Sequence, residues 1–218
     1  MKRREFAFKT SAAAVLASNL WAGAAQANAN KPVAGTDYLV LEPPAPVEAP
    51  ADKIEVLEFF WYNCPHCNAF EAGLNAWAKK LPKDVYFRRV PVAFREEFVP
   101  QQRLYYALEA MGLVDKLHAK VFAAIHAEKQ KLNDADAIAA WVGKQGVDTA
   151  KFSQQFNSFG VVTKANKARK LQDLYQIQGV PSLGVAGRFY VDGELARNNM
   201  ETALKIVDAL VATVRSGK

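Results

Sequence analysis

Residues 54–67 read IEVLEFFWYNCPHC, a short aromatic run that leads into two cysteines separated by Pro65 and His66. Residues 54–61 are mostly apolar and a proline-containing turn follows them, so they predict a buried strand. From Pro65 onward, apolar residues recur at spacings of three and four, which predicts a helix. These residues are Phe70, Leu74, Trp77, Ala78 and Leu81. The cysteines therefore lie at the turn where a strand becomes a helix.

The remaining sequence predicts an α/β fold. Residues 85–90 (VYFRRV) predict a second strand, and the order strand, helix, strand predicts a right-handed unit with parallel pairing. Helical periodicity then fills the sequence up to the next strands. Residues 182–185 and 188–191 predict a hairpin, and residues 200–214 predict a terminal helix. The result is a central mixed sheet, flanked by helices and interrupted by an all-helical insertion.

The surroundings of the two cysteines favour a thiolate on Cys64. Pro65 suits the first helical position, so the Cys64 sulfur faces free amides and the positive end of the helix dipole. Cys67 lies one turn deeper within bonding reach, and His66 is a further positive or hydrogen-bonding partner of Cys64. A dithiol that is stabilised in its reduced form makes an oxidising disulfide. The sequence therefore predicts thiol–disulfide exchange in which Cys64 is attacked and Cys67 resolves.

Three other interpretations of the cysteines are weaker. Half of a zinc site would need His118 and His126, eight residues apart, or carboxylates as further ligands. Haem attachment needs a histidine directly after the second cysteine, where Asn68 stands. A purely structural disulfide would close a tiny loop and so stabilise the fold little. We therefore expect no metal and no organic cofactor.

Two residues outside the cysteine motif are candidates for the same chemistry. Glu58 is an acid inside an aromatic strand; if buried, it should have a raised pKa and could relay a proton to or from Cys67. The alternative for Glu58 is a solvent-facing edge position. Pro181 begins a strand, and its bond to Val180 is a place for the cis isomer. The alternative there is an ordinary trans proline that ends the preceding helix.

Residues 1–27 predict a cleaved export signal, because basic residues precede an Ala-rich apolar stretch and a small-x-small cleavage site. A membrane anchor is the alternative, but the stretch is shorter than the roughly 20 apolar residues of a spanning helix. Arg3 and Arg4 leave open whether export follows the general secretory (Sec) or the twin-arginine route. Residues 28–36 predict a flexible leader.

The formal net charge of +6 at pH 7 does not indicate nucleic-acid binding. Residues 1–27 hold four of the 28 basic residues and one of the 22 acidic residues, so the rest of the chain carries only +3. The sequence also lacks a stripe of Lys and Arg with interleaved aromatic residues. We expect no nucleic-acid partner.

The run VLEFF at residues 56–60, the CPHC motif at 64–67 and GVP at 179–181 together resemble the DsbA family of periplasmic thiol:disulfide oxidoreductases. The resemblance extends over nearly all of the chain after the export signal. It implies a thioredoxin fold split by the helical insertion. The implied parts are a first thioredoxin-like segment at residues 37–94, the insertion at 95–165 and a second thioredoxin-like segment at 166–218.

The resemblance also implies roles for individual residues. Val180 and Pro181 would form a cis-proline loop that presses against the active-site disulfide and offers backbone groups to a substrate chain. Glu58 would be the buried acid beneath the cysteines. A lysine partners that acid in some family members; here Arg88 and Arg89 occupy the neighbouring strand, and the sequence does not place the partner.

The activity implied by the resemblance is donation of the Cys64–Cys67 disulfide to reduced, unfolded proteins that have been exported. A quinone-linked membrane oxidase of the DsbB kind would reoxidise the pair, and the protein would act in the periplasm as a monomer. A disulfide isomerase or reductase of the same superfamily is one alternative, although isomerases of the DsbC kind carry a dimerisation domain before the cysteine domain. A redox-inactive peptide-binding or chaperone module is the other.

Overall fold

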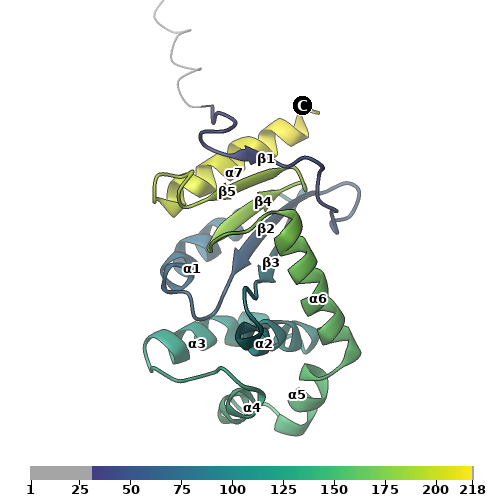
Figure 1. Cartoon of the computed structure of the whole chain (residues 1–218), viewed down its shortest axis with the longest axis vertical. Helices are drawn as coiled ribbons and strands as arrows, with labels where there is room; N and C mark the ends of the chain where they lie inside the picture. Colours follow the sequence, from purple (N-terminus) through teal and green to yellow (C-terminus); the bar gives the residue numbers. More distant parts are fainter. Residues whose placement is uncertain (1–30, 218) are drawn as a thin grey trace, which may run out of the picture. The chain divides into compact units, whose positions relative to one another are not determined.

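The computed structural model describes residues 31–217, and a five-stranded sheet lies at its centre (Figure 1). The strands are ordered β1-β5-β4-β2-β3. Strands β2 and β3 pair in parallel and the other neighbours are antiparallel, so the sheet is mixed, as the sequence predicts. The strands are β1 (Leu39–Val40), β2 (Ile54–Phe60), β3 (Val85–Pro91), β4 (Ser182–Val185) and β5 (Phe189–Asp192).

Two helices, α1 (Pro65–Ala78) and α7 (Met200–Arg215), cover one face of the sheet. Because side chains alternate along a strand, Val56 of β2 points into the cluster that joins these helices to the sheet. Leu57 and Phe59 point to the opposite face, into the cluster shared with the insertion. Both faces of β2 are therefore buried, which explains its nearly continuous apolar run.

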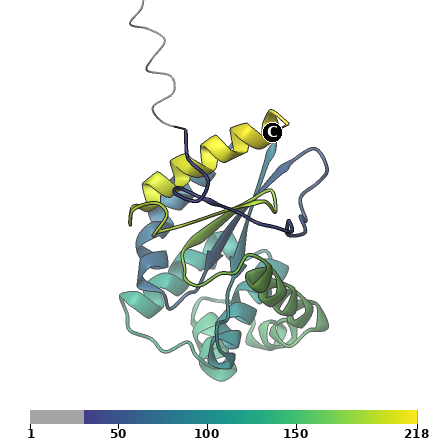
Figure 2. The same cartoon turned by 45° about the horizontal axis from the view of Figure 1, so that its top comes forward.

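The predicted helical insertion consists of helices that gather on the side of the sheet away from α7 (Figures 1 and 2). Helix α6 returns from the insertion and contacts both α2 and β3. The boundary expected at residue 165 lies inside α6, which is continuous across it. The helices are α2 (Val99–Ala110), α3 (Val114–His126), α4 (Ala135–Lys144), α5 (Thr149–Phe156) and α6 (Phe159–Leu174), with a short 3-10 turn at Glu96–Phe98 before them.

Short polar side chains fix where several helices begin. Asp134, Asp148 and Ser158 each accept a hydrogen bond from the backbone amide three residues later, at the starts of α4, α5 and α6. Such caps satisfy amides that the helix itself leaves without partners. At α1 the same place is taken by Cys64, whose sulfur accepts from the amide of Cys67.

The predicted hairpin between β4 and β5 turns through Ala186 and Gly187, whose φ angles are 52° and 67°. Two consecutive positive φ angles are typical of the tight turns that connect antiparallel strands. Gly187 is also required sterically, because a Cβ there would collide with the carbonyl oxygen of Ala45. The extended arm before β2 is thereby packed on the hairpin.

The expected export signal at residues 1–27, and residues 28–30 of the expected leader, lie outside the described residues. The rest of the leader contains a turn, in which the amide of Asp37 donates to the carbonyl of Val33 at 2.8 Å and the amide of Val33 donates to the Asp37 carboxylate at 2.8 Å. Among residues 31–217, none of the helices has the length and apolar character needed to cross a membrane.

Candidate active site

Both cysteines lie at the start of α1, as the sequence predicts, and both are free thiols in this structure. Cys64 is the N-cap, with an extended backbone (φ −81°, ψ 118°), and Pro65 follows at the first helical position. The amide of Cys67 donates to the Cys64 sulfur at 3.4 Å. Cys67 is fully buried, whereas Cys64 retains 7% of its surface. Cys64 is therefore the sulfur that a partner molecule can reach.

The pKa of Cys64 is lowered to about 6. The largest cause is a hydrogen bond from the Cys67 side chain; burial opposes it, and the backbone amides of Cys67 and His66 add to the lowering. The positive charge that His66 can carry acts in the same direction, from an exposed position. Burial raises the pKa of Cys67 far above its ordinary value. The two thiols are thus divided into one thiolate and one proton donor.

The Val180–Pro181 peptide bond is cis, and it lies against the active-site sulfur. The Cys64 thiol donates a hydrogen bond to the carbonyl oxygen of Val180 at 3.3 Å. Pro181 is buried and Val180 is half-buried. The hydroxyl of Ser182 donates to the carbonyl of Gly179 at 2.6 Å, which closes this loop on itself. The loop therefore presents backbone groups directly beside Cys64.

Glu58 is buried, with 1% of its surface exposed, and not at a solvent-facing edge. Burial raises its pKa to about 8, although the neighbouring positive charge of Arg89 opposes this. One oxygen, Oε2, accepts from Arg89 Nε at 2.9 Å, whereas Oε1 has no hydrogen-bond partner among the described residues. Its charge is close enough to Cys67 to contribute to the raised pKa of that thiol. Such a carboxyl group can hold or release a proton near neutral pH.

The basic partner that the sequence left open is Arg89. In the parallel register of β2 and β3, Glu58 lies opposite Arg89, and their side chains project to the same face. Arg89 Nη2 lies 3.4 Å from Glu71 Oε1 and donates to Asn75 Oδ1 at 2.7 Å, both on α1. Arg88 projects to the other face, where its Nε pairs with Glu55 at 2.9 Å. One guanidinium thus serves two buried acids beneath the cysteines.

The two histidines of α3 contact the turn that precedes Cys64. His118 Nδ1 lies 2.8 Å from the Tyr62 hydroxyl, and His126 Nε2 donates to the Tyr62 carbonyl at 2.9 Å. These contacts were not predicted, because the sequence shows only two histidines on one helix and not what they face. Within the part of the chain that is described, no group of three His, Cys, Asp or Glu side chains could hold a metal ion.

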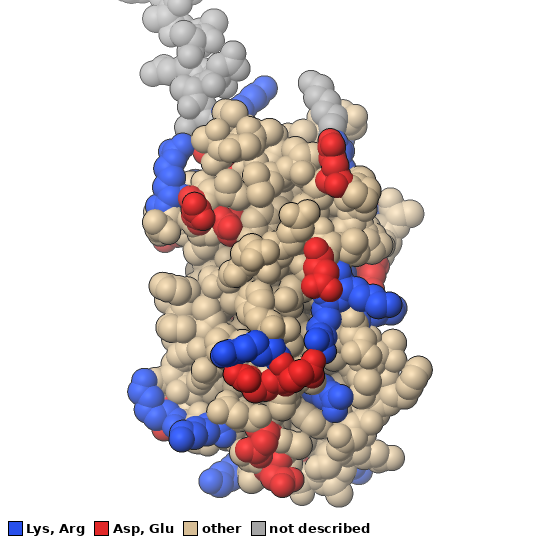
Figure 3. Space-filling model, in the orientation of Figure 1, with Lys and Arg blue, Asp and Glu red and all other residues tan. Residues whose placement is uncertain are grey.

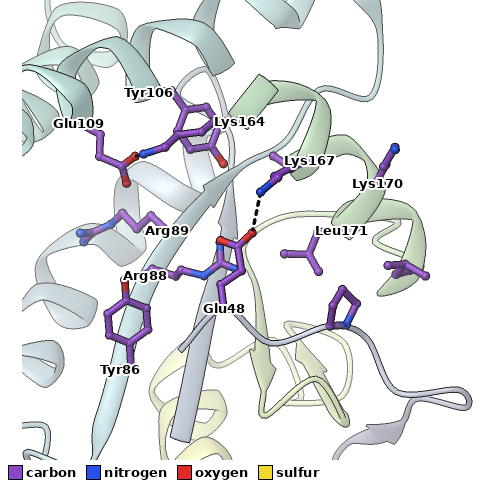
Figure 4. Close-up of a pocket in the computed structure, with 13 residues that line it drawn as sticks. Glu48, Tyr86, Arg88, Arg89, Tyr106, Glu109, Lys164, Lys167, Lys170 and Leu171 are labelled. Carbon is purple, nitrogen blue, oxygen red and sulfur yellow. Dashed lines mark hydrogen bonds and ion pairs between the residues drawn. The ribbon is translucent and has the colours of Figure 1, made fainter. Parts of the chain in front are cut away.

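The space-filling view shows acidic and basic side chains side by side on one face, without a continuous basic stripe (Figure 3). A cavity of about 470 Å³ lies between the edge of β3 and helices α2 and α6 (Figure 4). Lysines from α6 and Arg88 from β3 line it, and Lys167 pairs with Glu48 at 3.9 Å across it. The cysteines and the cis-proline loop do not line this cavity, so it is separate from the redox pair.

Comparison with known proteins identifies relatives over almost the whole chain. Residues 55–205 match the model of the DSBA-like thioredoxin domain family. The Thiol:disulfide interchange protein DsbA of Burkholderia cepacia is 43% identical over 204 residues, which cover 94% of this chain and 96% of that protein. The crystal structure of Pseudomonas aeruginosa DsbA superposes with a TM-score of 0.81 at 40% identity, covering 85% of this chain and 95% of that one. DsbA from Xylella fastidiosa gives a TM-score of 0.79 at 34% identity, covering 86% of this chain and 100% of that chain.

Proposed function

Because the chain belongs to the DSBA-like thioredoxin domain family and is a thiol:disulfide oxidoreductase, we propose that it works as an oxidase, donating the Cys64–Cys67 disulfide to exported proteins. The observation that carries the proposed direction is the lowered pKa of Cys64, about 6. A thiol of low pKa is a good leaving group, and stabilisation of the reduced pair makes its disulfide a strong oxidant. That low-pKa, oxidising character is the established property of DsbA, so the direction agrees with the family.

The proposed reaction has two exchange steps. A thiolate of the reduced substrate attacks Cys64 Sγ, the Cys64–Cys67 bond breaks, and the leaving Cys67 sulfur takes up a proton. A second substrate thiolate then attacks the substrate sulfur of the mixed disulfide and expels Cys64 as a thiolate. The substrate has lost two electrons and gained a disulfide, and the enzyme holds a dithiol.

The site residues have distinct parts in this scheme. Glu58, whose pKa is raised to about 8 by burial, exchanges the proton that Cys67 needs. His66 and Pro65 support the Cys64 thiolate, the first by charge and by its amide, the second by starting the helix. The backbone of Val180 and Pro181 pairs with the extended substrate chain, since its carbonyl already lies beside the attacked sulfur.

The deciding experiment is the equilibrium of the Cys64–Cys67 pair with glutathione, together with the Cys64 pKa from thiolate absorbance. We expect an oxidising potential and a pKa well below the free-thiol value of about 8.5. A reducing potential with a near-neutral or higher pKa would replace the oxidase by a reductase or isomerase. Full activity of a Cys64→Ser variant in cells would instead support a peptide-binding module.

The partners and the location need separate tests. In cells, a Cys67→Ser variant should accumulate mixed disulfides with exported proteins. Its Cys64 thiolate attacks a substrate disulfide and releases one substrate thiolate, and no Cys67 thiol remains to displace the bound chain. Reoxidation by a quinone-linked membrane oxidase of the DsbB kind predicts that quinone depletion leaves the pair reduced.

Cell fractionation should place the mature chain in the periplasm, and sedimentation should show a monomer. Export that is unaffected by Arg3→Lys with Arg4→Lys would exclude the twin-arginine route.

The proposed division into a thioredoxin-like part (37–94 and 166–218) and an insertion (95–165) is supported by the helical character of the insertion. Helix α6 spans the second junction, so we expect the two parts to unfold together. Hydrogen exchange that protects α3 and β2 to the same extent would support this expectation, and independent opening of α2–α5 would contradict it.

A further inference from the structure

We propose that His118 and His126 of α3 act as positioning residues that set the redox properties of the Cys64–Cys67 pair by holding Tyr62. Helix α3 belongs to the insertion, and within residues 31–217 no hydrogen bond joins either histidine to a cysteine. His118 hydrogen-bonds to the Tyr62 hydroxyl at 2.8 Å, and His126 hydrogen-bonds to the Tyr62 backbone carbonyl at 2.9 Å. Tyr62 is 1% exposed and lies two residues before Cys64.

The donor and the acceptor can be assigned in both hydrogen bonds to Tyr62. His118 Nε2 lies 3.4 Å from Glu71 Oε1, and its Nδ1 faces the Tyr62 hydroxyl. The Glu71 contact is long and lacks hydrogen-bond geometry, so we treat it as an electrostatic contact. Burial lowers the pKa of His118 and so favours its neutral ring. The Glu71 carboxylate beside Nε2 favours the tautomer with hydrogen on that nitrogen, which leaves Nδ1 to accept from the tyrosine. His126 donates through Nε2 to the Tyr62 carbonyl, at a half-buried position.

The turn that contains Tyr62 interacts with both cysteine residues through its backbone. The amide of Cys64 donates to the carbonyl of Trp61 at 3.0 Å, closing the turn around Tyr62. The amide of Trp61 acts on the Cys67 sulfur and favours its negative charge. A shift of Tyr62 would therefore move the amide that faces Cys67 and the turn that carries Cys64. Since the Cys67 side chain is the largest cause of the low pKa of Cys64, that pKa depends on this placement.

Aromatic packing surrounds these two bonds. Phe122, one turn after His118, contacts the rings of Tyr62, His118 and His126 at centroid distances of 5.1, 5.3 and 6.1 Å. Phe122 makes no hydrogen bond through its side chain. It therefore offers a matched control, since a change there loosens the packing and leaves both histidine bonds chemically possible.

The experiment measures the glutathione equilibrium and the Cys64 pKa in purified variants. Tyr62→Phe and His118→Leu each remove the bond between the Tyr62 hydroxyl and His118, and His126→Leu removes the bond to the Tyr62 carbonyl. We expect each to raise the Cys64 pKa by about half a unit or more and to change the glutathione equilibrium about threefold toward a weaker oxidant. The conservative variants His118→Asn, which keeps an acceptor, and His126→Gln, which keeps a donor, should restore most of the wild-type values.

The control variant Phe122→Leu should lower the melting temperature without a comparable change in the pKa or the equilibrium. The proposal is overturned if Tyr62→Phe and His118→Leu lower stability while leaving both redox values at those of Phe122→Leu. If the leucine variants fail to fold, Tyr62→Phe alone tests the proposal. This variant removes only one oxygen atom and is therefore expected to fold. This test requires a redox-active Cys64–Cys67 pair but not the proposed oxidase direction. A reducing wild-type potential would refute the oxidase, and the Cys64 pKa and the glutathione equilibrium could still differ between the variants.

Discussion

The carbonyl oxygen of Val180 lies 3.3 Å from the sulfur of Cys64, although the two residues are 116 positions apart in the chain. The thiol donates this bond, so the contact exists only while Cys64 is protonated. When the sulfur ionises, it is supported instead by the Cys67 side chain and by the amides at the start of α1. The same carbonyl therefore becomes available to an amide of a bound chain in the thiolate state.

Selective alkylation should show that Cys64 is ionised at neutral pH and that Cys67 is not. With a pKa of about 6, Cys64 is roughly 90% ionised at pH 7, whereas Cys67 stays protonated. Iodoacetamide should therefore label Cys64 alone in the reduced protein, with a rate that falls as pH drops through 6. Mass spectrometry of peptides locates the label. Equal labelling of both residues in the folded protein would contradict the assignment.

The stability of the reduced form should depend on pH in a way that the oxidised form does not. The Cys64 pKa falls from an ordinary 9.0 to about 6 on folding, so its contribution is complete above pH 9 and is lost as pH falls through 6. Between these limits the free energy of unfolding of the reduced form should rise by about 1 kcal/mol per pH unit at most, relative to the oxidised form. Urea unfolding of both forms at pH 5, 7 and 8 tests this. A constant difference would refute it.

Substitution of Glu58 should remove a pH dependence of opposite sign. Its pKa rises from 4.5 to about 8 on folding, so the native state binds a proton that the unfolded state has released. Ionised Glu58 therefore destabilises the fold as pH rises from 4.5 to 8. The free energy of unfolding of Glu58→Gln, minus that of the wild type, should increase over this range, by about 1 kcal/mol per pH unit at most. Parallel stability curves would show that Glu58 does not titrate there.

Arg89 should be far more sensitive to truncation than to conservative exchange. Arg89→Met leaves Glu71 buried without its cation and Glu58 without its hydrogen-bond donor, and loss of one partner of a buried pair costs about 3–5 kcal/mol. Arg89→Lys keeps a charge and should cost less. Arg215→Met, which removes an exposed pair with Asp84, is the control and should change stability by less than about 1 kcal/mol. Similar losses in Arg89→Met and Arg215→Met would refute the special role of Arg89.

His66 should influence Cys64 through charge. Because His66 is exposed and its charge lowers the Cys64 pKa, His66→Ala should raise that pKa by less than about one unit. Asn68→Ala, at another exposed position of the same helix turn, is the control and should leave the value in place. Thiolate absorbance at a series of pH values measures both. A larger effect of the Asn68 variant would mean that helix geometry, and not charge, sets the pKa.

The fold and the cysteine chemistry could be predicted because local rules agree there. Residues 54–60 are apolar in a short run, Pro65 starts a helix, and the cysteines follow the strand directly. The cis bond before Pro181 was expected chiefly from the family resemblance, and the structure confirms it. The strand, the helix start and the placement of the cysteines depend on neighbours in the chain, so the sequence alone predicts them.

The partners of the site residues were harder to predict, because they depend on register and on packing between distant segments. Arg88 and Arg89 are adjacent, and only the pairing of Glu58 with Arg89 decides which one faces the buried acid. The sequence offers His118 and His126 only as weak candidates for zinc ligands. Their contact with Tyr62 follows from how α3 packs against α1 and against Phe60 at the end of β2, which no local pattern reports.

The chain has two cysteines in all, and both stand in the active-site turn. A catalyst of disulfide exchange built in this way reaches its own fold without the product of the reaction it carries out. It also offers its active site no third thiol to attack within the same molecule, so the Cys64–Cys67 disulfide cannot be lost to an internal cross-link. A newly made copy can therefore fold before any oxidant is present, and its two cysteines can be oxidised to the disulfide afterwards.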